Sequence, residues 1–484
     1  MSSTTTINGV VYTIITGAGS FELLDWTGAG SQTNFMISGF TSVANNALKD
    51  QTTITNVHIG NTVQSIGNYV FKGTTNLISV SFESNSQLTS IGFYAFSESA
   101  LTSIAIPDTV TSIGYGAFYK ATSLNSITFG ANSQLTSIGS YAFRNATALT
   151  SIAIPDTLTT IGDGAFYATS LNSITFGANS QLNTIGSYAF KNATALTTIA
   201  IPDTVTTFGS SAFYETTSLN SITFGANSQL NSIGDYAFRY ASALTTIAIP
   251  DTVTTIGTYA FYGTSNLISV TFGANSQLTI IERFAFYQAS ALTSIAIPDL
   301  VTSIGSSAFS NATELASITF GASSQLNTIE DYTFWNATSL TSIIIPDTVN
   351  TIGNYAFFAT SLTSIAIPDL VTSIGSSAFK EATLLTSVNF GANSQLTGIG
   401  EQAFREASAL TSIAIPDLVT TISDWAFYGT TSLTSITIPD TVTSIGSNAF
   451  LSTGLTSVSL TEDLTIDGTT YAIGTSGSFF GAVN

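Results

Sequence analysis

The sequence predicts a solenoid of short stacked repeats, and three observations predict it. A phenylalanine recurs every 22 to 25 residues, a short apolar segment of alternating side chains lies in each interval, and all nine prolines directly follow such a segment. One coil of this size cannot bury its own apolar face, so neighbouring coils must cover each other. A length of 484 residues would otherwise suggest several globular domains, but a repeat array grows without a new core for each domain.

The recurring phenylalanines count the repeats. The intervals mostly alternate near 25 and 23 residues, so the longer period is a pair of repeats. The 17 anchors are Phe71, Phe96, Phe118, Phe143, Phe166, Phe190, Phe213, Phe238, Phe261, Phe286, Phe309, Phe334, Phe357, Phe379, Phe404, Phe427 and Phe450.

Each repeat begins with a short strand. In Leu101–Ile106 the residues Ile104 and Ile106 point inward, because successive side chains in a strand alternate between its two faces. In the sister repeat, Phe129 takes the last inward position. Proline has no N–H to donate to a sheet, so each Ile-Pro-Asp triplet ends a strand. The outward positions of four successive repeats form a strand ladder: Ser103, Ala105, Ser126, Thr128, Ser151, Ala153, Ser173 and Thr175.

The second part of each repeat reads V-x-x-I-G-x-x-A-F. Its apolar residues recur at steps of three and four, which predicts a short helical or 3-10 turn. We expect the glycine of this motif, for example Gly139, to supply a backbone conformation that a side chain would strain. A tyrosine often stands two residues before the anchor, and a lysine or arginine often follows it. The tyrosines form a second candidate contact surface, and the bases are expected to provide solubility and local pairing with acids.

Leu101–Phe118, LTSIAIPDTVTSIGYGAF, resembles the repeat of the BspA-like leucine-rich repeat family, L-x-x-I-x-I-P-x-x-V-x-x-I-G-x-x-A-F. The resemblance covers residues 53–459. It implies a right-handed leucine-rich repeat solenoid of about 17 repeats, with a parallel sheet on the concave face and helical or 3-10 turns on the convex face. It also implies a surface or secreted protein that binds other proteins, matrix or cells. The cysteine that often follows the A-F pair in the family is absent here.

Residues 1–52 and 460–484 fall outside the array and resemble each other. TINGVVYTIITGAGSF (Thr6–Phe21) aligns with TIDGTTYAIGTSGSF (Thr465–Phe479), and each contains a dipeptide that favours a two-residue hairpin turn. Two interpretations remain open: both segments cap the ends of the core, or they meet between molecules and build an open fibre. The candidate assembly residues are Thr6, Asn8, Gly9, Tyr12, Thr465, Asp467, Gly468 and Tyr471.

The charge balance narrows the class of partner. With 28 acidic and nine basic residues, the net charge is −19. We therefore expect no binding to nucleic acid, which requires basic surfaces. No apolar run approaches the ~18 residues of a membrane span, so no membrane insertion is predicted. The first residues do not form an ordinary signal peptide. We expect an extracellular or cell-surface protein whose route the sequence does not reveal.

The sequence offers no recognisable catalytic, metal or cofactor site. The absence of cysteine excludes thiol chemistry, and His58 is the one histidine, expected at a solvated outward strand position. An aspartate follows each proline, as in Asp156, and we expect its carboxylate to accept backbone N–H bonds in the turn. A cation-binding acidic stripe is the alternative, but such aspartates mostly lie two strands apart, about 10 Å. The repeated GANSQL segments are predicted to be turns.

Two functions fit these observations. The first is a non-enzymatic recognition or adhesion protein whose flat, hydroxyl-rich strand ladder meets a protein or polysaccharide on another surface. The second is a structural subunit whose similar ends join copies head-to-tail into an extracellular filament or a phage or virus fibre.

Overall fold

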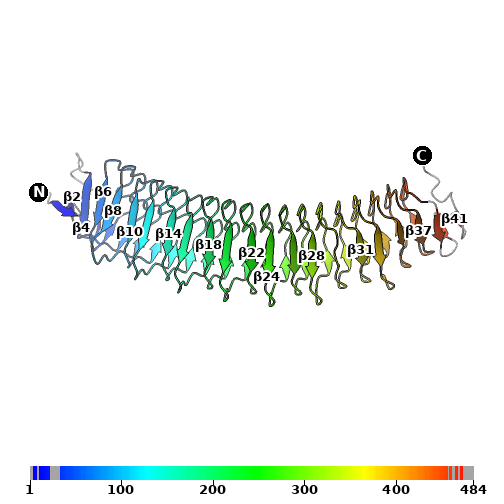
Figure 1. Cartoon of the computed structure of the whole chain (residues 1–484). Helices are drawn as coiled ribbons and strands as arrows, with labels where there is room; N and C mark the ends of the chain where they lie inside the picture. Colours follow the sequence, from blue (N-terminus) through cyan, green and yellow to red (C-terminus); the bar gives the residue numbers. More distant parts are fainter. Residues whose placement is uncertain are drawn as a thin grey trace. The chain divides into compact units, whose positions relative to one another are not determined.

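The computed structural model describes residues 4–7, 10–21, 33–455, 457–460, 464–466 and 469–471; of residues 457–471 it describes the strands alone. The chain divides into two compact units, Met1–Leu244 and Thr245–Asn484. Each unit is a β-solenoid in which one coil after another is added along the chain (Figure 1). Both units are built from the same three-part coil: a long strand, a short strand and a limb of turns.

The long strands form parallel sheets, as predicted. Most have four residues, and each pairs with the long strand of a neighbouring coil. In the first unit they are β2 (Val10–Thr16), β4 (Asn34–Ser38), β6 (Asn56–Ile59), β8 (Ser79–Phe82), β10 (Ser103–Ile106), β12 (Ser126–Phe129), β14 (Ser151–Ile154), β16 (Ser173–Phe176), β18 (Thr198–Ile201) and β20 (Ser221–Phe224). In the second unit they are β22 (Thr246–Ile249), β24 (Ser269–Phe272), β26 (Ser294–Ile297), β28 (Ser317–Phe320), β31 (Ser364–Ile367), β33 (Ser387–Phe390), β35 (Ser412–Ala414), β37 (Ser435–Ile438) and β39 (Ser457–Leu460).

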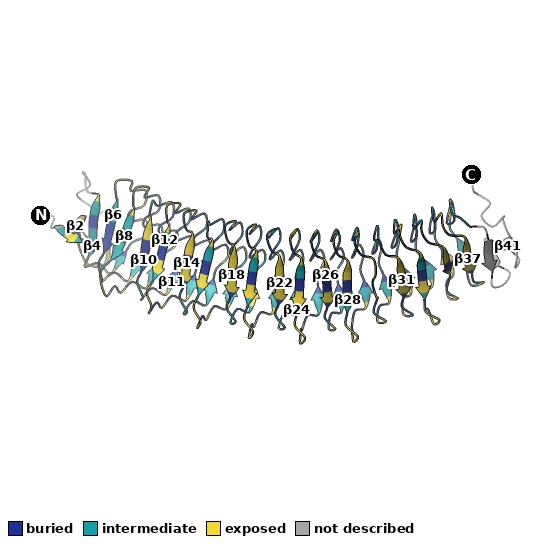
Figure 2. Cartoon of the chain, viewed as in Figure 1, coloured by how far each residue is buried: buried dark blue, intermediate teal, exposed yellow. Residues whose placement is uncertain are grey.

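Register and burial of the long strands follow the two-residue alternation. Ile104 lies opposite Ile127, and both are buried, whereas Ala105 and Thr128 lie opposite each other and are exposed. Figure 2 shows buried and exposed bands on long strands such as β10 and β14, whose residues alternate between exposed and buried. Phe129 departs from the prediction, because its ring is only half-buried. The ring is larger than the Ile106 side chain in register with it, and part of it stays outside the core.

Two-residue strands run along a second side of each coil and also pair in parallel. In the first unit they are β3 (Ser20–Phe21), β5 (Ser42–Val43), β7 (Ser65–Ile66), β9 (Ser90–Ile91), β11 (Ser112–Ile113), β13 (Ser137–Ile138), β15 (Thr160–Ile161), β17 (Thr184–Ile185), β19 (Thr207–Phe208) and β21 (Ser232–Ile233). In the second unit they are β23 (Thr255–Ile256), β25 (Ile280–Ile281), β27 (Ser303–Ile304), β29 (Thr328–Ile329), β30 (Thr351–Ile352), β32 (Ser373–Ile374), β34 (Gly398–Ile399), β36 (Thr421–Ile422) and β38 (Ser444–Ile445).

The third side is a limb of consecutive turns, and the prediction of helical or 3-10 turns there is not confirmed: the described residues contain no helix. Backbone N–H groups alternate between two kinds of acceptor. Ser97 donates to Tyr94 O within its own coil at 3.1 Å, whereas Phe96 donates to Ala117 O of the next coil at 2.7 Å. Tyr94 and Glu98 have positive φ angles, 52° and 58°. A left-handed residue at every fourth position interrupts the right-handed run that a helix needs.

The glycine that recurs in this limb has a different role from the one expected. Gly139 does not have a positive φ angle; Tyr141, two residues later, has one of 57°. A Cβ atom on Gly139 would lie 2.8 Å from both the carbonyl carbon of Gly114 and the carbonyl oxygen of Ile113 in the preceding coil. Glycine therefore permits the close approach of two coils rather than a strained backbone.

A stack of phenylalanine rings runs through the core of each unit. In the first unit, the ring of Phe166 lies 5.3 Å from that of Phe143 and 5.4 Å from that of Phe190, and the rings are within 10° of parallel. All three side chains are fully buried. The second unit repeats the arrangement, for example between Phe404 and Phe427 at 5.3 Å. The anchors predicted from the sequence thus form the ring stack.

Antiparallel hairpins occur near both ends of the chain. The strand β1 (Thr4–Ile7) pairs with β2, and Ile7 lies opposite Val10, which leaves two residues between the strands. The strand β40 (Leu464–Ile466) pairs in the same way with β41 (Thr469–Tyr471). On its other edge β2 pairs in parallel with β4, so the first hairpin continues the sheet. The coil that holds β4 and β5 precedes residue 53, where the repeat pattern becomes visible in the sequence.

Removal of one ring from the stack should destabilise the fold strongly. We predict that Phe166→Ala lowers the free energy of unfolding by about 3–5 kcal/mol, because the fully buried ring leaves a cavity between two neighbours. Phe93 is 54% exposed, and Phe93→Ala should cost less than about 0.5 kcal/mol. Urea unfolding followed by circular dichroism measures both. Equal losses in the two variants would contradict the role assigned to the stack.

Candidate functional site

The strand ladder predicted from the sequence is accessible. Its residues lie on the outer face of β10, β12, β14 and β16, in register across each pair of strands: Ser103 with Ser126, Ala105 with Thr128, Ser151 with Ser173 and Ala153 with Thr175. Ser126 and Ser173 are half-buried, and the other six ladder residues are exposed. The structure therefore brings all eight residues to one surface of the first unit.

The hydroxyl groups of this ladder differ from those beside the short strands. There, Thr111, Thr136 and Thr159 each donate a hydrogen bond to a threonine carbonyl of the preceding coil, at 3.0–3.1 Å. These hydroxyls are occupied by the fold. No hydroxyl of the strand ladder makes a hydrogen bond to any residue that the structure describes. They remain available to a partner.

The equivalent face of the second unit carries one prominent apolar residue. Ile344 is 86% exposed, the highest value among the large exposed apolar side chains that the structure describes. Its place in the repeat is that of Ala296 and Ala366, which are small and exposed. At this position most coils therefore present a small side chain, whereas this coil presents a large apolar one.

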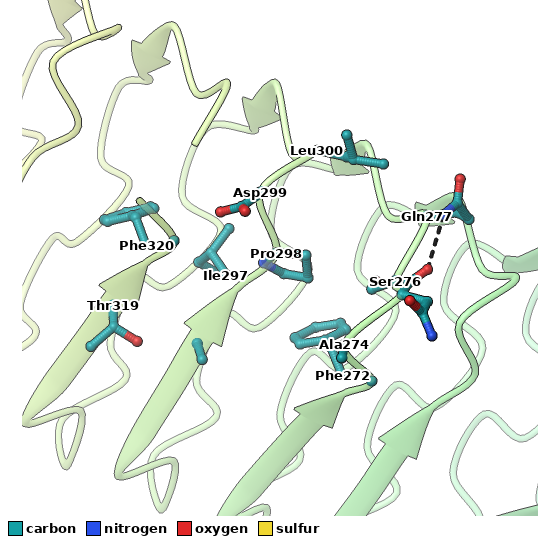
Figure 3. A pocket seen from close by; sticks show the side chains of 14 residues that line it. Phe272, Ala274, Ser276, Gln277, Ile297, Pro298, Asp299, Leu300, Thr319 and Phe320 are labelled. Carbon is teal, nitrogen blue, oxygen red and sulfur yellow. Dashed lines mark hydrogen bonds between the residues drawn. The ribbon is translucent and has the colours of Figure 1, made fainter. Parts of the chain in front are cut away.

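A cleft lies at the end of the long strands in the second unit. It has a volume of about 540 Å³ and opens between the segment Gly273–Gln277 and the end of β28. Ala296 is among its lining residues. Ile297 and Pro298 lie between the rings of Phe272 and Phe320, which line the cleft on either side (Figure 3). Polar groups reach it from Asn275, Gln277, Asp299 and Thr319. No lysine or arginine lines it.

The sequence predicted the GANSQL segments as turns but not this cleft. The signal that could have indicated it is the alternation of two connections. The Gly-Ala-Asn-Ser-Gln connection after Phe272 is two residues longer than the Pro-Asp-Leu connection after Ile297. A longer connection on each side of a shorter one leaves a hollow above the short one.

The turn limb gathers aromatic and basic side chains. The guanidinium of Arg144 lies 4.6 Å from the ring centre of Tyr167, and the ammonium of Lys191 lies 4.4 Å from that of Tyr214. Such cation–π contacts hold the bases against the surface. Arg405 forms an ion pair with Glu406, at 3.2 Å. Burial, and then the contact with Tyr115, raises the pKa of Tyr94 to about 12.

His58 is buried, contrary to the expectation of a solvated side chain. It is 5% exposed, its Nδ1 lies 2.8 Å from Ser81 Oγ, and its ring centre lies 5.9 Å from that of Tyr12. Tyr12 belongs to the first hairpin. The sequence resemblance between the two hairpins did not indicate that Tyr12 packs against His58. Burial lowers the pKa of His58, and the nearby carboxylate of Glu83 opposes that shift only in part. No carboxylate hydrogen-bonds to the imidazole within the described residues.

Four of the aspartates that follow the prolines do not use the carboxylate Oδ1 atom as expected: Asp156, Asp203, Asp251 and Asp369. The Oδ1 atom of Asp156 is buried and accepts no hydrogen bond from any described residue. It packs against Gly177 of the next coil, where any side chain would overlap with it. The backbone carbonyl of Asp156 instead accepts the N–H of Gln181 at 2.9 Å. Among the described residues, no group of three histidine or acidic side chains could hold a metal ion.

The candidate assembly residues are only partly described. Thr6 is exposed in β1, and Tyr12 is buried in β2. Thr465 and Tyr471 lie in β40 and β41, opposite Thr470 and Leu464. The turn residues Asn8, Gly9, Asp467 and Gly468 lie outside the described residues. A search of the described residues for a helix long and apolar enough to cross a membrane finds none.

Comparisons with known proteins agree with the repeat pattern. The model of the BspA type leucine rich repeat region (6 copies) matches residues 41–134, 130–240, 231–362 and 350–472. No curated protein matches the chain.

Solved leucine-rich repeat structures resemble the chain in fold. A leucine-rich repeat protein from Bacteroides ovatus is 21% identical, with 93% of this chain and 90% of that chain covered and a TM-score of 0.44. A leucine rich cell surface protein from Faecalibacterium prausnitzii is 24% identical, with 81% and 95% covered and a TM-score of 0.37. The pneumococcal vaccine antigen PcpA is 19% identical, with 87% and 93% covered and a TM-score of 0.41.

The buried histidine predicts a pH dependence of the first coils. The pKa of His58 is below its ordinary value of 6.5 in the folded state, so the unfolded chain binds a proton first as the pH falls. Stability should be constant above about pH 7 and decrease as the pH falls through 6.5. Hydrogen exchange of the β4, β6 and β8 amides at pH 7.5 and 5.5, corrected for intrinsic rates, measures this. In a His58→Gln variant, protection at the two pH values should be the same. If protection still falls at pH 5.5 in that variant, His58 is not the cause of the pH dependence.

Proposed function

Because this chain belongs to the BspA-type leucine-rich repeat family, we propose that it is a non-enzymatic recognition and adhesion protein that works at a cell surface or outside the cell. Proteins of this family are typically surface or secreted repeat proteins of adhesion type. The fold supplies a repetitive surface rather than an enclosed active site, and fold alone does not identify a ligand. The proposal therefore rests on the side chains that the surface presents.

The free hydroxyl groups of the strand ladder carry this proposal. A partner that docks on the ladder forms hydrogen bonds without breaking bonds of the fold, because these hydroxyls have no partner among the described residues. The face also presents no charged side chain between Ser103 and Thr175, so little desolvation of charge opposes binding. A row of weak, equivalent contacts favours a repetitive or extended partner, such as a protein or polysaccharide on another surface.

The histidine, the net charge and the basic side chains support a role in binding rather than in catalysis. The single histidine is buried beneath Tyr12 and is not paired with a carboxylate. A net charge of −19 disfavours nucleic acid and anionic membranes as partners. The bases that do occur on the turn limb are largely engaged by tyrosine rings.

Large acidic side chains on the ladder should abolish adhesion. We predict that Thr128→Glu combined with Thr175→Glu reduces retention of the fluorescently labelled full chain on washed epithelial cells about tenfold or more, because both side chains project from the flat face. Flow cytometry measures the retention. The matched control is Thr122→Glu with Thr147→Glu, two exposed residues outside the long strands, which should retain binding within about twofold. Equal retention of both variants would contradict a role for the ladder.

A second function, head-to-tail assembly, is favoured by the two end hairpins. Both are antiparallel with two residues between their strands, and their sequences align. Matched but non-identical ends that join in one direction build an open fibre. Negative-stain microscopy of the purified chain over a hundredfold range of concentration tests this function. Fibres of regular repeat support it, and single particles at every concentration contradict it.

A further inference from the structure

We propose that the cleft beside Phe272 and Phe320 binds pyranose rings of a neutral β-1,4-linked polysaccharide. This inference rests on the proposed recognition function and names a ligand class and a site for it. The site lies at the ends of the long strands β24, β26 and β28 in the second unit, and it shares no residue with the strand ladder, which belongs to the first unit.

The cleft has the two kinds of surface that a pyranose ring requires. One face of such a ring presents C–H groups and packs on aromatic side chains, whose faces carry partial negative charge. The half-buried rings of Phe272 and Phe320 line the cleft, and the small side chains of Ala296 and Pro298 leave room between them. The rim of the sugar carries hydroxyl groups that need donors and acceptors at the edge of the site.

Polar side chains occupy that edge. Asn275 and Gln277 provide amides, Asp299 a carboxylate and Thr319 a hydroxyl. The Nε2 of Gln277 donates to Asn275 O at 2.9 Å, so this amide is held in place, and its oxygen stays free to accept from a sugar hydroxyl (Figure 3). A few polar groups at fixed positions around an apolar floor are typical of small-ligand sites.

Charge excludes the acidic polysaccharides. The cleft contains no base to neutralise a carboxylate or sulfate, and Asp299 would repel either. The whole chain carries a net charge of −19, which adds to this repulsion at low ionic strength. The ligand class is therefore a neutral sugar chain.

The repeat of the cleft residues indicates a linear polymer. In the first unit, Phe129 and Phe176 stand in the same register and are half-buried like Phe272 and Phe320, with Pro155 between them. Equivalent positions lie two coils apart, about 10 Å. A disaccharide of an extended β-1,4-linked chain has nearly this length, so successive disaccharides can place equivalent rings at successive sites.

The test uses the full chain with cellohexaose and chitohexaose as neutral probes and an oligogalacturonate as the anionic probe, measured by isothermal titration calorimetry. We expect saturable binding of at least one neutral hexasaccharide and none of the anionic probe. The relative response to the two neutral probes identifies the sugar. Failure of both neutral probes to bind at millimolar concentration, or equal binding of the anionic probe, would overturn the proposal.

Variants locate the binding. Each long connection contains one exposed glutamine, and a variant with all seven changed to alanine removes this amide from every long connection: Gln87, Gln134, Gln181, Gln229, Gln277, Gln325 and Gln395. We expect about a tenfold or greater loss of affinity, because several hydrogen bonds are removed together.

The matched control is Asn125→Ala with Asn172→Ala, two exposed amides at the opposite ends of their strands, which should bind within about twofold of the unmodified chain. Unchanged affinity in the glutamine variant would place any sugar elsewhere and refute this site. The proposed adhesion function is judged separately, because the glutamate pair at Thr128 and Thr175 tests cell retention without reference to these sugars.

Discussion

The mutual burial of neighbouring coils is the constraint on which the rest of the structure depends. Each of the 17 predicted repeats contributes one phenylalanine ring to the stack of its unit, the spacings within each unit are 5.1–5.8 Å, and nearly every ring is fully buried. Leucine, isoleucine and valine side chains form further buried columns beside it. A single coil of 22 to 25 residues could not cover these side chains, so stability is a property of adjacent coils and not of one coil.

The mutual burial of coils does not constrain the side chains on their outer surface. These outward side chains make different contacts on each of the three sides of the coil. Beside the short strands, threonine hydroxyls bind the preceding coil and reinforce the stack. On the turn limb, tyrosine rings engage lysine and arginine. On the long strands, the serine and threonine hydroxyls of the strand ladder have no partner among the described residues, and in the second unit the alternating connections at the strand ends open a cleft. We therefore propose that recognition uses this side of the coils.

The core was predictable from the sequence because it repeats. The 17 phenylalanines, the alternation along Leu101–Ile106 and the position of each proline fixed the coil and its long strand. The turn limb was predicted wrongly, because steps of three and four residues are shared by helices and by consecutive turns; the positive φ angles of Tyr94 and Glu98 distinguish the two. His58 was misplaced because its burial depends on Tyr12, a residue 46 positions earlier in a hairpin outside the repeat. The cleft was missed because it arises from a difference of two residues between neighbouring connections.

Native-state hydrogen exchange on a chain with one interrupted coil tests the mutual-burial claim most directly. Ile185 is fully buried in β17, and Ile185→Asp places a charge in the core of that coil alone. If coils are stable only through their neighbours, protection should also fall in the coils of Ile161 and Phe208, and recover gradually with distance on both sides. Loss of protection confined to the coil of Ile185, with both adjacent coils unchanged, would contradict the claim.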